Sequence, residues 1–501
     1  MAALAAAFAP DAAAVQRLPV IVVPELELAD LEPLADRGAI GLLVPAAGPR
    51  ASARSAEAAL VRGEVENSLR GGLPEGDPLI SFERSNTPPS EGPAIILALP
   101  RGGDQPNDRR YPIVVLAPGY RGLLESSSTR IPGIVSIVDV APTALGADDA
   151  LDSQAAQDPV PRLRELDGRI DENNSSRALA ALVVWVSIIV LAFIFPRGAL
   201  LAFPCVLAAN LALGAAGISA RWAVIGVFVL SVFCAAPLVA RVARSKTAIG
   251  LTCAAILAGY LAAFAIDGRW LALSPLGPTQ NARFFGLSNL LETFLLVPAL
   301  IGAAYLGRRH WSLFAGVAVL AVVTIAGSRF GADGGGAVVL AAAYAALAAA
   351  FARSRGLVLG VAAVAAASFV GLLLLVDELT GSSSHVTRTL RGGPDDLAEA
   401  FWDRIVLSWE RATDRVSTEL IVSIAILALA LLVLRLVRAG KGASEAALPV
   451  AVGVAVAVSL VVNDSPSDVV VTGLVAYLAV EAFVLPDVSW AGALGRRIEG
   501  P

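Results

Sequence analysis

Long apolar runs separated by short polar connections dominate the chain from Arg177 onward. Each run has roughly 17 to 20 residues, the length that a helix needs to cross the hydrocarbon core of a membrane. The eleven runs begin near Ala178, Ala199, Trp222, Thr247, Ser288, Trp311, Gly334, Gly356, Ser417, Ala446 and Asp468. The pattern therefore predicts an all-α polytopic transmembrane domain of about eleven helices over residues 177–486, with a short tail at 487–501.

Basic residues are concentrated in alternate connections between the apolar runs. They are Arg197; Arg241, Arg244 and Lys246; Arg308 and Arg309; Arg353 and Arg355; Arg435, Arg438 and Lys441; and Arg496 and Arg497 in the tail. Short connections rich in Lys and Arg stay in the cytoplasm. The rule predicts that the C-terminus is cytoplasmic and that the part before the first span lies outside the cytoplasm. We expect the membrane to be a bacterial plasma membrane.

The part that precedes the first span has the pattern of an extracytoplasmic α/β domain at residues 18–145. Its short β-branched runs are bounded by Pro or Gly and do not alternate cleanly, which is typical of a sheet covered on both faces. The runs are Pro19–Val23, Ala39–Val44, Ala94–Leu99, Tyr111–Leu116 and Gly133–Val140. A helix-like segment, LELADLEPLADRG, lies between the first two and ends at Gly38.

The segments on either side of this domain are less regular. Residues 146–176 are rich in Asp, Gln, Arg and Asn, which predicts a polar linker that is either solvated or a stalk helix. Residues 1–17 carry a short Ala-rich stretch without a basic start, and we interpret them as either a truncated signal segment or a flexible tail.

Composition agrees with a membrane protein, since 56% of the residues are hydrophobic and the mean hydropathy is +0.70. The net charge of −5 is small, and no run of like charges predicts nucleic-acid binding. Cys205, Cys234 and Cys253 lie in separate apolar runs, and the two histidines have no ligand spacing, so we expect no disulfide framework, metal or cofactor. Abundant Ala, Arg, Gly and Val with few Lys is typical of a GC-rich bacterial genome.

The segment STRIPGIVSIVDVAPTAL, residues 128–145, resembles the late strand and D-x-x-P-T turn of the alkaline phosphatase and sulfatase superfamily. The resemblance implies an α/β fold with metals held by Asp and His around a Ser, Thr or Cys nucleophile. Here Pro24 and Glu25 stand where the superfamily places a metal-binding Asp, and no histidine precedes His310. We therefore interpret residues 18–145 as a truncated, catalytically inactive relative in which Asp139 is a turn residue.

The membrane part is similar to that of bacterial envelope proteins of unassigned activity that carry RFYGxGNE-like, Gly-rich and NDSG-like segments. Here these segments are Arg283 to Glu292, Gly331 to Gly336, and Asn463-Asp464-Ser465. The chain departs from that pattern by having its acid at Glu292, after Ser-Asn-Leu, and by having Pro466 where Gly is expected.

These three polar segments are the candidate site. Asn289 and Glu292 are three residues apart and share a helix face, and a carboxylate in an apolar run needs a partner, for which Arg283 is the obvious candidate. Glycines that open a helix expose backbone N–H groups, which together with arginines suit an anion such as a phosphate. Alternatively, the glycines serve only close helix packing. The candidate substrate-binding residues are Arg283, Asn289, Glu292, Arg329, Asp333, Gly334, Gly335, Asn463 and Asp464, with Glu292 and Asp464 as candidate general bases.

One long connection, residues 377–416, is predicted to contain an amphipathic helix on the outer side. Leu397, Phe401, Ile405 and Trp409 recur at helical spacing, with Trp402 on the flank. The helix either lies flat on the membrane surface or packs against the α/β domain.

Three functions fit these features. The first is translocation of an anionic lipid-linked or glycan precursor of the cell envelope, the second is a membrane-embedded transferase acting on such a substrate, and the third is a scaffold that binds envelope proteins without chemistry. A transporter needs polar residues in both leaflets, whereas we find little beyond Asn210 and Glu481 in the cytoplasmic halves. The partners implied are the lipid bilayer, the lipid-linked substrate and envelope proteins.

Overall fold

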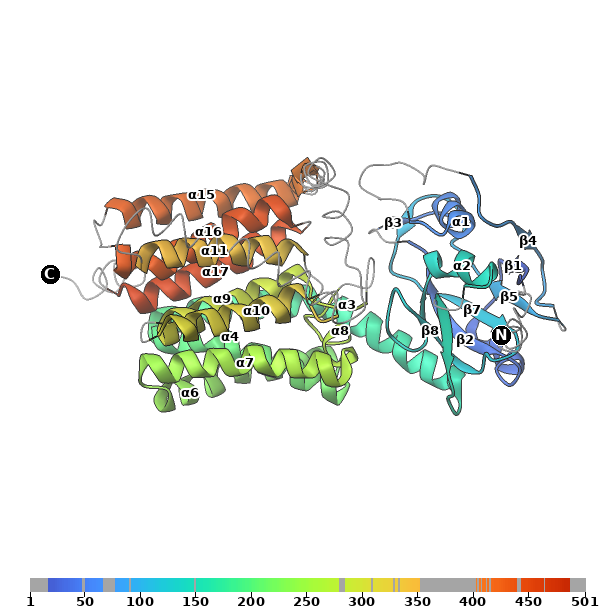
Figure 1. Cartoon of the computed structure of the whole chain (residues 1–501), viewed down its shortest axis with the longest axis horizontal. Helices are drawn as coiled ribbons and strands as arrows, with labels where there is room; N and C mark the ends of the chain where they lie inside the picture. The colour runs from blue at the N-terminus through green and yellow to red at the C-terminus, as the bar shows by residue number, and fades with distance from the viewer. Residues whose placement is uncertain are drawn as a thin grey trace, which may run out of the picture. The chain divides into compact units, whose positions relative to one another are not determined.

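The computed structural model describes residues 17–46, 50–65, 77–89, 92–147, 150–278, 284–307, 310–327, 329–331, 334–351, 416–438, 443–463 and 465–486, together with residues 402, 405, 406, 408–410, 412 and 413. The chain divides into two compact units (Figure 1). One consists of Met1–Asp171 with Thr279–Phe284, and the other of Glu172–Pro278 with Phe285–Pro501. The first is an α/β unit, and the second is helical.

The α/β unit is built on one mixed sheet. Its strands lie in the order β10-β8-β2-β7-β5-β1-β4, and β9 also pairs with β2. The strands are β1 (Val20–Val22), β2 (Ala39–Val44), β4 (Phe82–Arg84), β5 (Ala94–Leu97), β7 (Tyr111–Leu116), β8 (Gly122–Ser126), β9 (Ile134–Ser136) and β10 (Leu151–Gln154). A separate two-stranded sheet pairs β3 (Arg50–Ala51) with β6 (Gln105–Pro106).

All five predicted runs contain a strand, although three of the strands are shorter than the run. β1 covers only Val20–Val22. β5 ends two residues early, and β9 gives way after Ser136 to a 3-10 turn, Ile137–Asp139. β7 runs antiparallel to both β2 and β5, whereas β1 and β5 are parallel. β2 and β5 are buried along their whole length, which agrees with a sheet covered on both faces.

Short helices complete this unit. α1 (Ala53–Arg62) begins after Ser52, whose hydroxyl accepts a hydrogen bond from the Ser55 amide, and ends at Gly63, whose φ of 66° suits glycine. α1 and α2 (Val140–Ala144) share a buried core with β5 and β7. The helix-like segment after β1 is a 3-10 helix, η1 (Leu28–Leu34), which contains Pro33 and contacts β7.

Asp139 organises the turn that follows β9. Its carboxylate accepts hydrogen bonds from the Ser126 hydroxyl and from the Ser128 hydroxyl at 2.7 Å, and its backbone carbonyl accepts one from the Thr143 hydroxyl at 2.7 Å. Burial raises the pKa of Asp139 above its ordinary value of 3.8, and the bonds from Ser126 and Ser128 lower that pKa part of the way back. The aspartate joins β8 to α2, which is a structural role.

The raised pKa predicts that Asp139 weakens the folded α/β unit as the pH rises. The folded state holds the proton more tightly than the unfolded state, so the stability contribution is greatest below about pH 4 and falls as the pH rises from there through the folded pKa. Asp139→Asn is expected to flatten this part of the pH profile. Hydrogen exchange of residues 122–136 in the full-length protein, corrected for intrinsic rates, measures the slope. Asp152→Asn, at an exposed carboxylate on β10, is the control, and an unchanged slope in Asp139→Asn would contradict the prediction.

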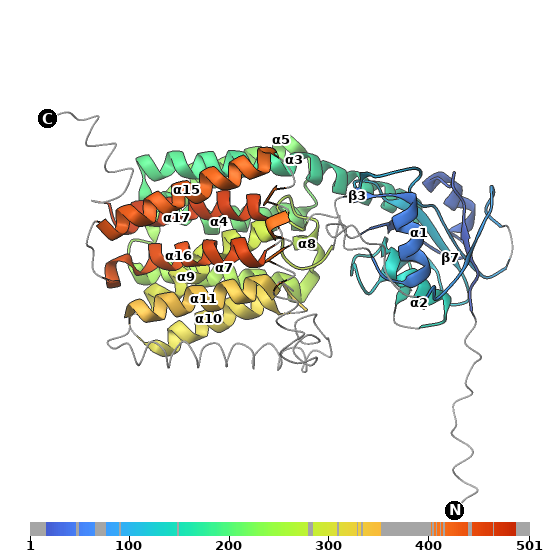
Figure 2. The ribbon, with the colours of Figure 1, turned by 90° about the horizontal axis from the view of Figure 1, so that it is seen from above.

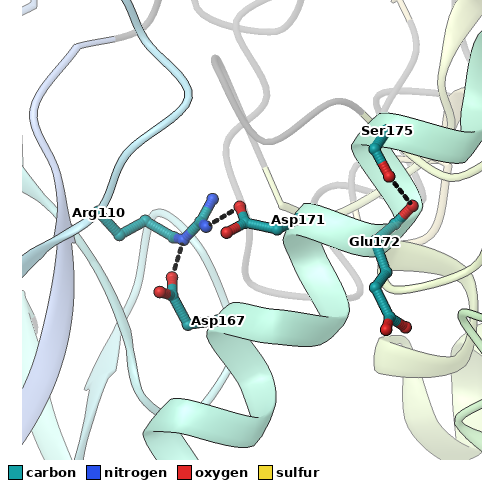
Figure 3. A network of polar contacts seen from close by, with 5 residues as sticks. All are labelled: Arg110, Asp167, Asp171, Glu172 and Ser175. Atoms are coloured by element: carbon teal, nitrogen blue, oxygen red, sulfur yellow. Dashed lines mark hydrogen bonds and ion pairs between the residues drawn. The ribbon is translucent and has the colours of Figure 1, made fainter.

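The segment 146–176, for which we expected a solvated linker or a stalk helix, contains an edge strand and the start of a long helix. β10 pairs antiparallel with β8, and α3 (Pro159–Ile194) begins five residues after it. Arg110, whose side chain is only 4% exposed, donates from its guanidinium to both Asp167 and Asp171, one turn apart on α3 (Figure 3). Because the buried guanidinium of Arg110 binds both carboxylates, the face of α3 that carries them is held against the loop before β7.

The helical unit contains, among its described residues, eight helices long and apolar enough to cross a membrane. They are the apolar part of α3, α4 (Pro196–Ala216), the continuous helix of α5 and α6 (Arg221–Val242) with a π-helical turn at Ser231–Ala235, α7 (Lys246–Asp267), α9 (Asn289–Gly307), α11 (Gly334–Phe351), α15 (Val416–Arg438) and α17 (Pro466–Val484). Two shorter helices, α10 (Trp311–Ala326) and α16 (Ala443–Val462), and a single turn, α8 (Arg269–Ala272), accompany them. Ten of the eleven predicted runs coincide with these helices, and the run that begins near Gly356 lies outside the described residues.

α9 is the most enclosed helix of this unit. Every residue from Leu290 to Leu306 is buried. α9 contacts α4, α7, α10, α11, α16 and α17, and the two views show it among these helices (Figures 1 and 2). Any polar side chain on α9 is therefore surrounded by protein rather than by lipid.

Candidate functional site

The first turn of α9 carries Glu292, whose side chain is completely buried. Ser288 caps the helix, because its hydroxyl oxygen accepts a hydrogen bond from the Leu291 amide at 3.1 Å.

Glu292 is in direct contact with Asn463, the residue that follows α16. The Asn463 side-chain amide donates to Glu292 Oε2 at 2.7 Å and to the Ser459 hydroxyl at 2.6 Å. Asn463 is 3% exposed and Ser459 is completely buried. Two of the candidate substrate-binding residues, 171 positions apart in the sequence, thus meet inside the helical unit.

The glycine-rich start of α11 approaches the same carboxylate. A Cβ atom on Gly336 would lie 3.0 Å from Glu292 Oε1 and 2.7 Å from Ile325 Cγ2, so this position has no room for a side chain. Gly335 is buried and Gly334 is half-buried. At Gly336, close helix packing accounts for the glycine, and this packing brings the first turn of α11 against Glu292.

Two connecting segments lie side by side next to this contact. The Leu287 amide donates to the Gly331 carbonyl at 2.8 Å, and the Gly331 amide donates to the Thr324 carbonyl at 3.1 Å. Arg329, in the second of these segments, is exposed, and Asn289 is half-buried at the start of α9. Arg283, Asp333 and Asp464 lie outside the described residues, so their roles stay predictions.

A buried loop precedes Ser288, and the sequence did not indicate it. Residues 271–278 are all buried, although only the first two belong to α8 and the rest have no regular secondary structure. Side chains satisfy their backbone groups: Asn210 Oδ1 accepts from the Leu276 amide at 2.9 Å, Asn173 donates to the Leu273 carbonyl at 2.9 Å, and Arg177 donates to the Gly277 carbonyl. Irregular backbone at membrane depth is tolerated where protein groups satisfy it in this way.

The loop is tied to the start of α9. The Ser288 hydroxyl donates to the Leu276 carbonyl at 2.8 Å, and Asn210 Nδ2 donates to the Ser274 hydroxyl at 2.9 Å. Asn210, which we assigned to a cytoplasmic half, therefore lies at the same end of the bundle as Ser288 and Glu292. Asn210 lies fourteen residues into α4, about 21 Å along the helix axis from Pro196, so it is nearer the end that carries Ser288 than the end that carries Arg197.

Charged groups of α3 and α17 lie at this end as well, because Arg177 interacts electrostatically with Asp468, near the start of α17. Deeper in the bundle, eight residues after Arg177, the Trp185 indole donates to the Thr472 hydroxyl at 3.1 Å. Together with the Glu292 contact and the bonds of the buried loop, the Arg177 interaction joins α3, α4, α9, α16 and α17 at one end of the bundle, which we call the polar end.

Basic residues occupy the other end. Arg197, at the start of α4, lies 6.0 Å from the Phe483 ring near the end of α17, and Lys246, at the start of α7, lies 5.9 Å from the Tyr305 ring near the end of α9. Both belong to connections that we predicted to be cytoplasmic. Their grouping at one end agrees with the predicted alternation of the connections, while the orientation in the membrane stays a prediction.

These features define a multi-pass membrane protein that carries an α/β unit and a polar contact at one end of its bundle. Comparisons with protein-family models, with curated proteins and with solved structures found no match for the chain. Among the residues that the structure describes, no three His, Cys, Asp or Glu side chains gather in a way that could hold a metal ion.

Proposed function

We propose that this membrane protein binds an anionic, lipid-linked glycan precursor at its polar end and moves it across the bilayer. The observation that carries the proposal is the contact between Glu292 and Asn463, which joins the first turn of α9 to the residue that follows α16. A carboxylate and an amide side by side bind sugar hydroxyl groups well, because the carboxylate accepts hydrogen bonds and the amide both donates and accepts them.

Cationic groups near these segments support the anionic part of the proposal. Arg329 is exposed in the segment whose Gly331 carbonyl holds Leu287, five residues before Glu292. Guanidinium groups bind phosphate with two parallel hydrogen bonds. A ligand that joins a phosphate to a sugar would use both kinds of group, and a lipid anchor would keep it in the membrane beside the bundle.

Transfer of a group to or from such a precursor is the second candidate, and the position of Asn210 favours it. With Asn210 at the polar end, the hydrogen bonds of Glu292 and Ser288 and the interaction of Arg177 with Asp468 belong to one end of the bundle. A transferase needs groups at one membrane face only, and Glu292 would be its general base.

Reconstitution separates the two candidates. The full-length protein is placed in phospholipid vesicles with a fluorescent sugar joined by a diphosphate to a polyprenyl chain. A translocator changes the fraction of this lipid that an outside quencher reaches and leaves its mass unchanged, whereas a transferase changes the mass. The free polyprenol is the control. If neither quantity changes and neither lipid shifts the melting temperature of the protein, both proposals fail and a non-catalytic scaffold remains.

A further inference from the structure

Two exposed tryptophans lie on the segment that precedes α15. Trp402 is 64% exposed and Trp409 is 71% exposed, and both residues are helical. Their separation of seven residues is close to two full helical turns, the spacing that puts two side chains on the same face of a helix. Trp409 belongs to the apolar face that the sequence predicts within residues 377–416, and Trp402 lies on its flank.

An adjacent side of this segment is fixed to the bundle. Ser408 is 4% exposed, and its hydroxyl donates to the Leu460 carbonyl on α16. Ala412 packs against the core of the helical unit. The segment is therefore fixed at a defined level of α16, and the two tryptophans stay exposed beside the contacting side.

That level is also the level of the candidate site. Leu460 precedes Asn463 by three residues, which is about 5 Å along a helix axis. Asn463 in turn donates to Glu292. The tryptophans therefore mark where the polar end lies along the bundle.

The surroundings indicate what covers the tryptophans. The next helix, α15, exposes a row of large apolar side chains along its length, which are Val416, Leu420, Ile424, Leu427 and Leu431. In a membrane protein, acyl chains cover such a row. Tryptophan combines an apolar ring with an N–H group and is enriched where acyl chains meet lipid headgroups.

We infer that Trp402 and Trp409 insert into the headgroup region of the bilayer and that the Glu292–Asn463 contact lies just below the membrane surface, not at its midplane. This inference rests on the proposed function and specifies how the substrate reaches Glu292. A polar head carried on a lipid would reach Glu292 by lateral diffusion at the level where headgroups already lie.

Spin labels measure the depth directly. Cys205, Cys234 and Cys253 are replaced by Ala in the full-length protein, and a nitroxide is attached to a new cysteine at Trp402 or at Trp409, in phosphatidylcholine vesicles. Accessibility to oxygen relative to a water-soluble nickel complex rises with depth. The references are exposed Asp108 in the α/β unit for water and exposed Leu427 on α15 for the acyl region.

The inference is supported if the ratio of oxygen to nickel accessibility at both Trp402 and Trp409 falls between the ratios at Asp108 and Leu427. A ratio equal to that at Asp108 would mean that the pair faces water, and low accessibility to both reagents would mean that protein covers it; either result overturns the inference. The vesicle assay with Glu292→Gln tests the proposed function separately, because that variant leaves the tryptophans unchanged.

Discussion

Glu292→Gln is expected to leave the protein folded and to weaken binding of the polyprenyl diphosphate sugar by at least about tenfold, equivalent to about 1.4 kcal/mol. Glutamine has nearly the size of glutamate and keeps one oxygen to accept the hydrogen bond from Asn463. What it removes is the negative charge and the second acceptor oxygen, both of which a bound sugar hydroxyl would use. The shift in melting temperature against ligand concentration, in detergent, measures the change.

The matched control for this change is Glu419→Gln. Glu419 also lies in the first turn of an apolar helix, α15, but it is exposed. This variant should bind the ligand as the original protein does. If Glu292→Gln and Glu419→Gln bind equally well, the buried carboxylate has no part in binding. Glu292→Ala is a harsher change, because a buried Asn463 amide that loses an acceptor costs about 1–3 kcal/mol of folding free energy.

Gly214→Ala is expected to destabilise the helical unit by about 3 kcal/mol, the upper part of the usual range for overpacking. A Cβ atom at Gly214 would lie 1.8 Å from the Trp270 carbonyl oxygen and 3.0 Å from Ser274 Cβ. The Trp270 carbonyl oxygen belongs to the backbone, so it cannot rotate away from the added Cβ atom. The buried loop 271–278 would have to leave α4, and it would lose its bonds to Asn210. Thermal unfolding in detergent, with hydrogen exchange of residues 271–278, measures both effects.

Gly316→Ala on α10 is the control for this second change. A Cβ atom at Gly316 would meet no atom within 4 Å, so the same substitution adds only helix propensity, a gain of up to about 1 kcal/mol. We expect hydrogen exchange in Gly214→Ala to be faster only in the loop 271–278, and exchange of this loop in Gly316→Ala to be unchanged. Equal melting temperatures for the two variants would show that the loop is not packed on α4 at this position.

The positions of the helices could be predicted from the sequence because the length of each apolar run decides them. A run long enough to span the membrane must satisfy its backbone internally, so its apolar character also predicts a helix. The same reasoning indicated that Glu292 needed a protein partner. The sequence suggested Arg283 for that role, which stays a prediction because Arg283 lies outside the described residues, and among the described residues Asn463 contacts the carboxylate.

The buried loop could not be predicted, since its burial depends on side chains far away in the sequence. Residues 271–278 resemble an ordinary connection, with Ser, Pro and Gly. Only Asn210 gave a signal, as an amide within an apolar run, and nothing local indicated that its partners were Ser274 and Leu276. In the α/β unit, the short edge strands β4 and β10 were missed because they are largely exposed and pair with distant strands.

The loop also bears on how the bundle assembles during synthesis. Backbone groups of residues 273–277 would be unsatisfied in lipid, and the side chains that satisfy them on α3 and α4 come earlier in the chain. Asn173, Arg177 and Asn210 therefore enter the membrane before the loop that they hold. Insertion from the N-terminus gives α7 and α9 a prepared surface to fold against, so a chain that lacks α3 should stall with α7 inserted and be degraded.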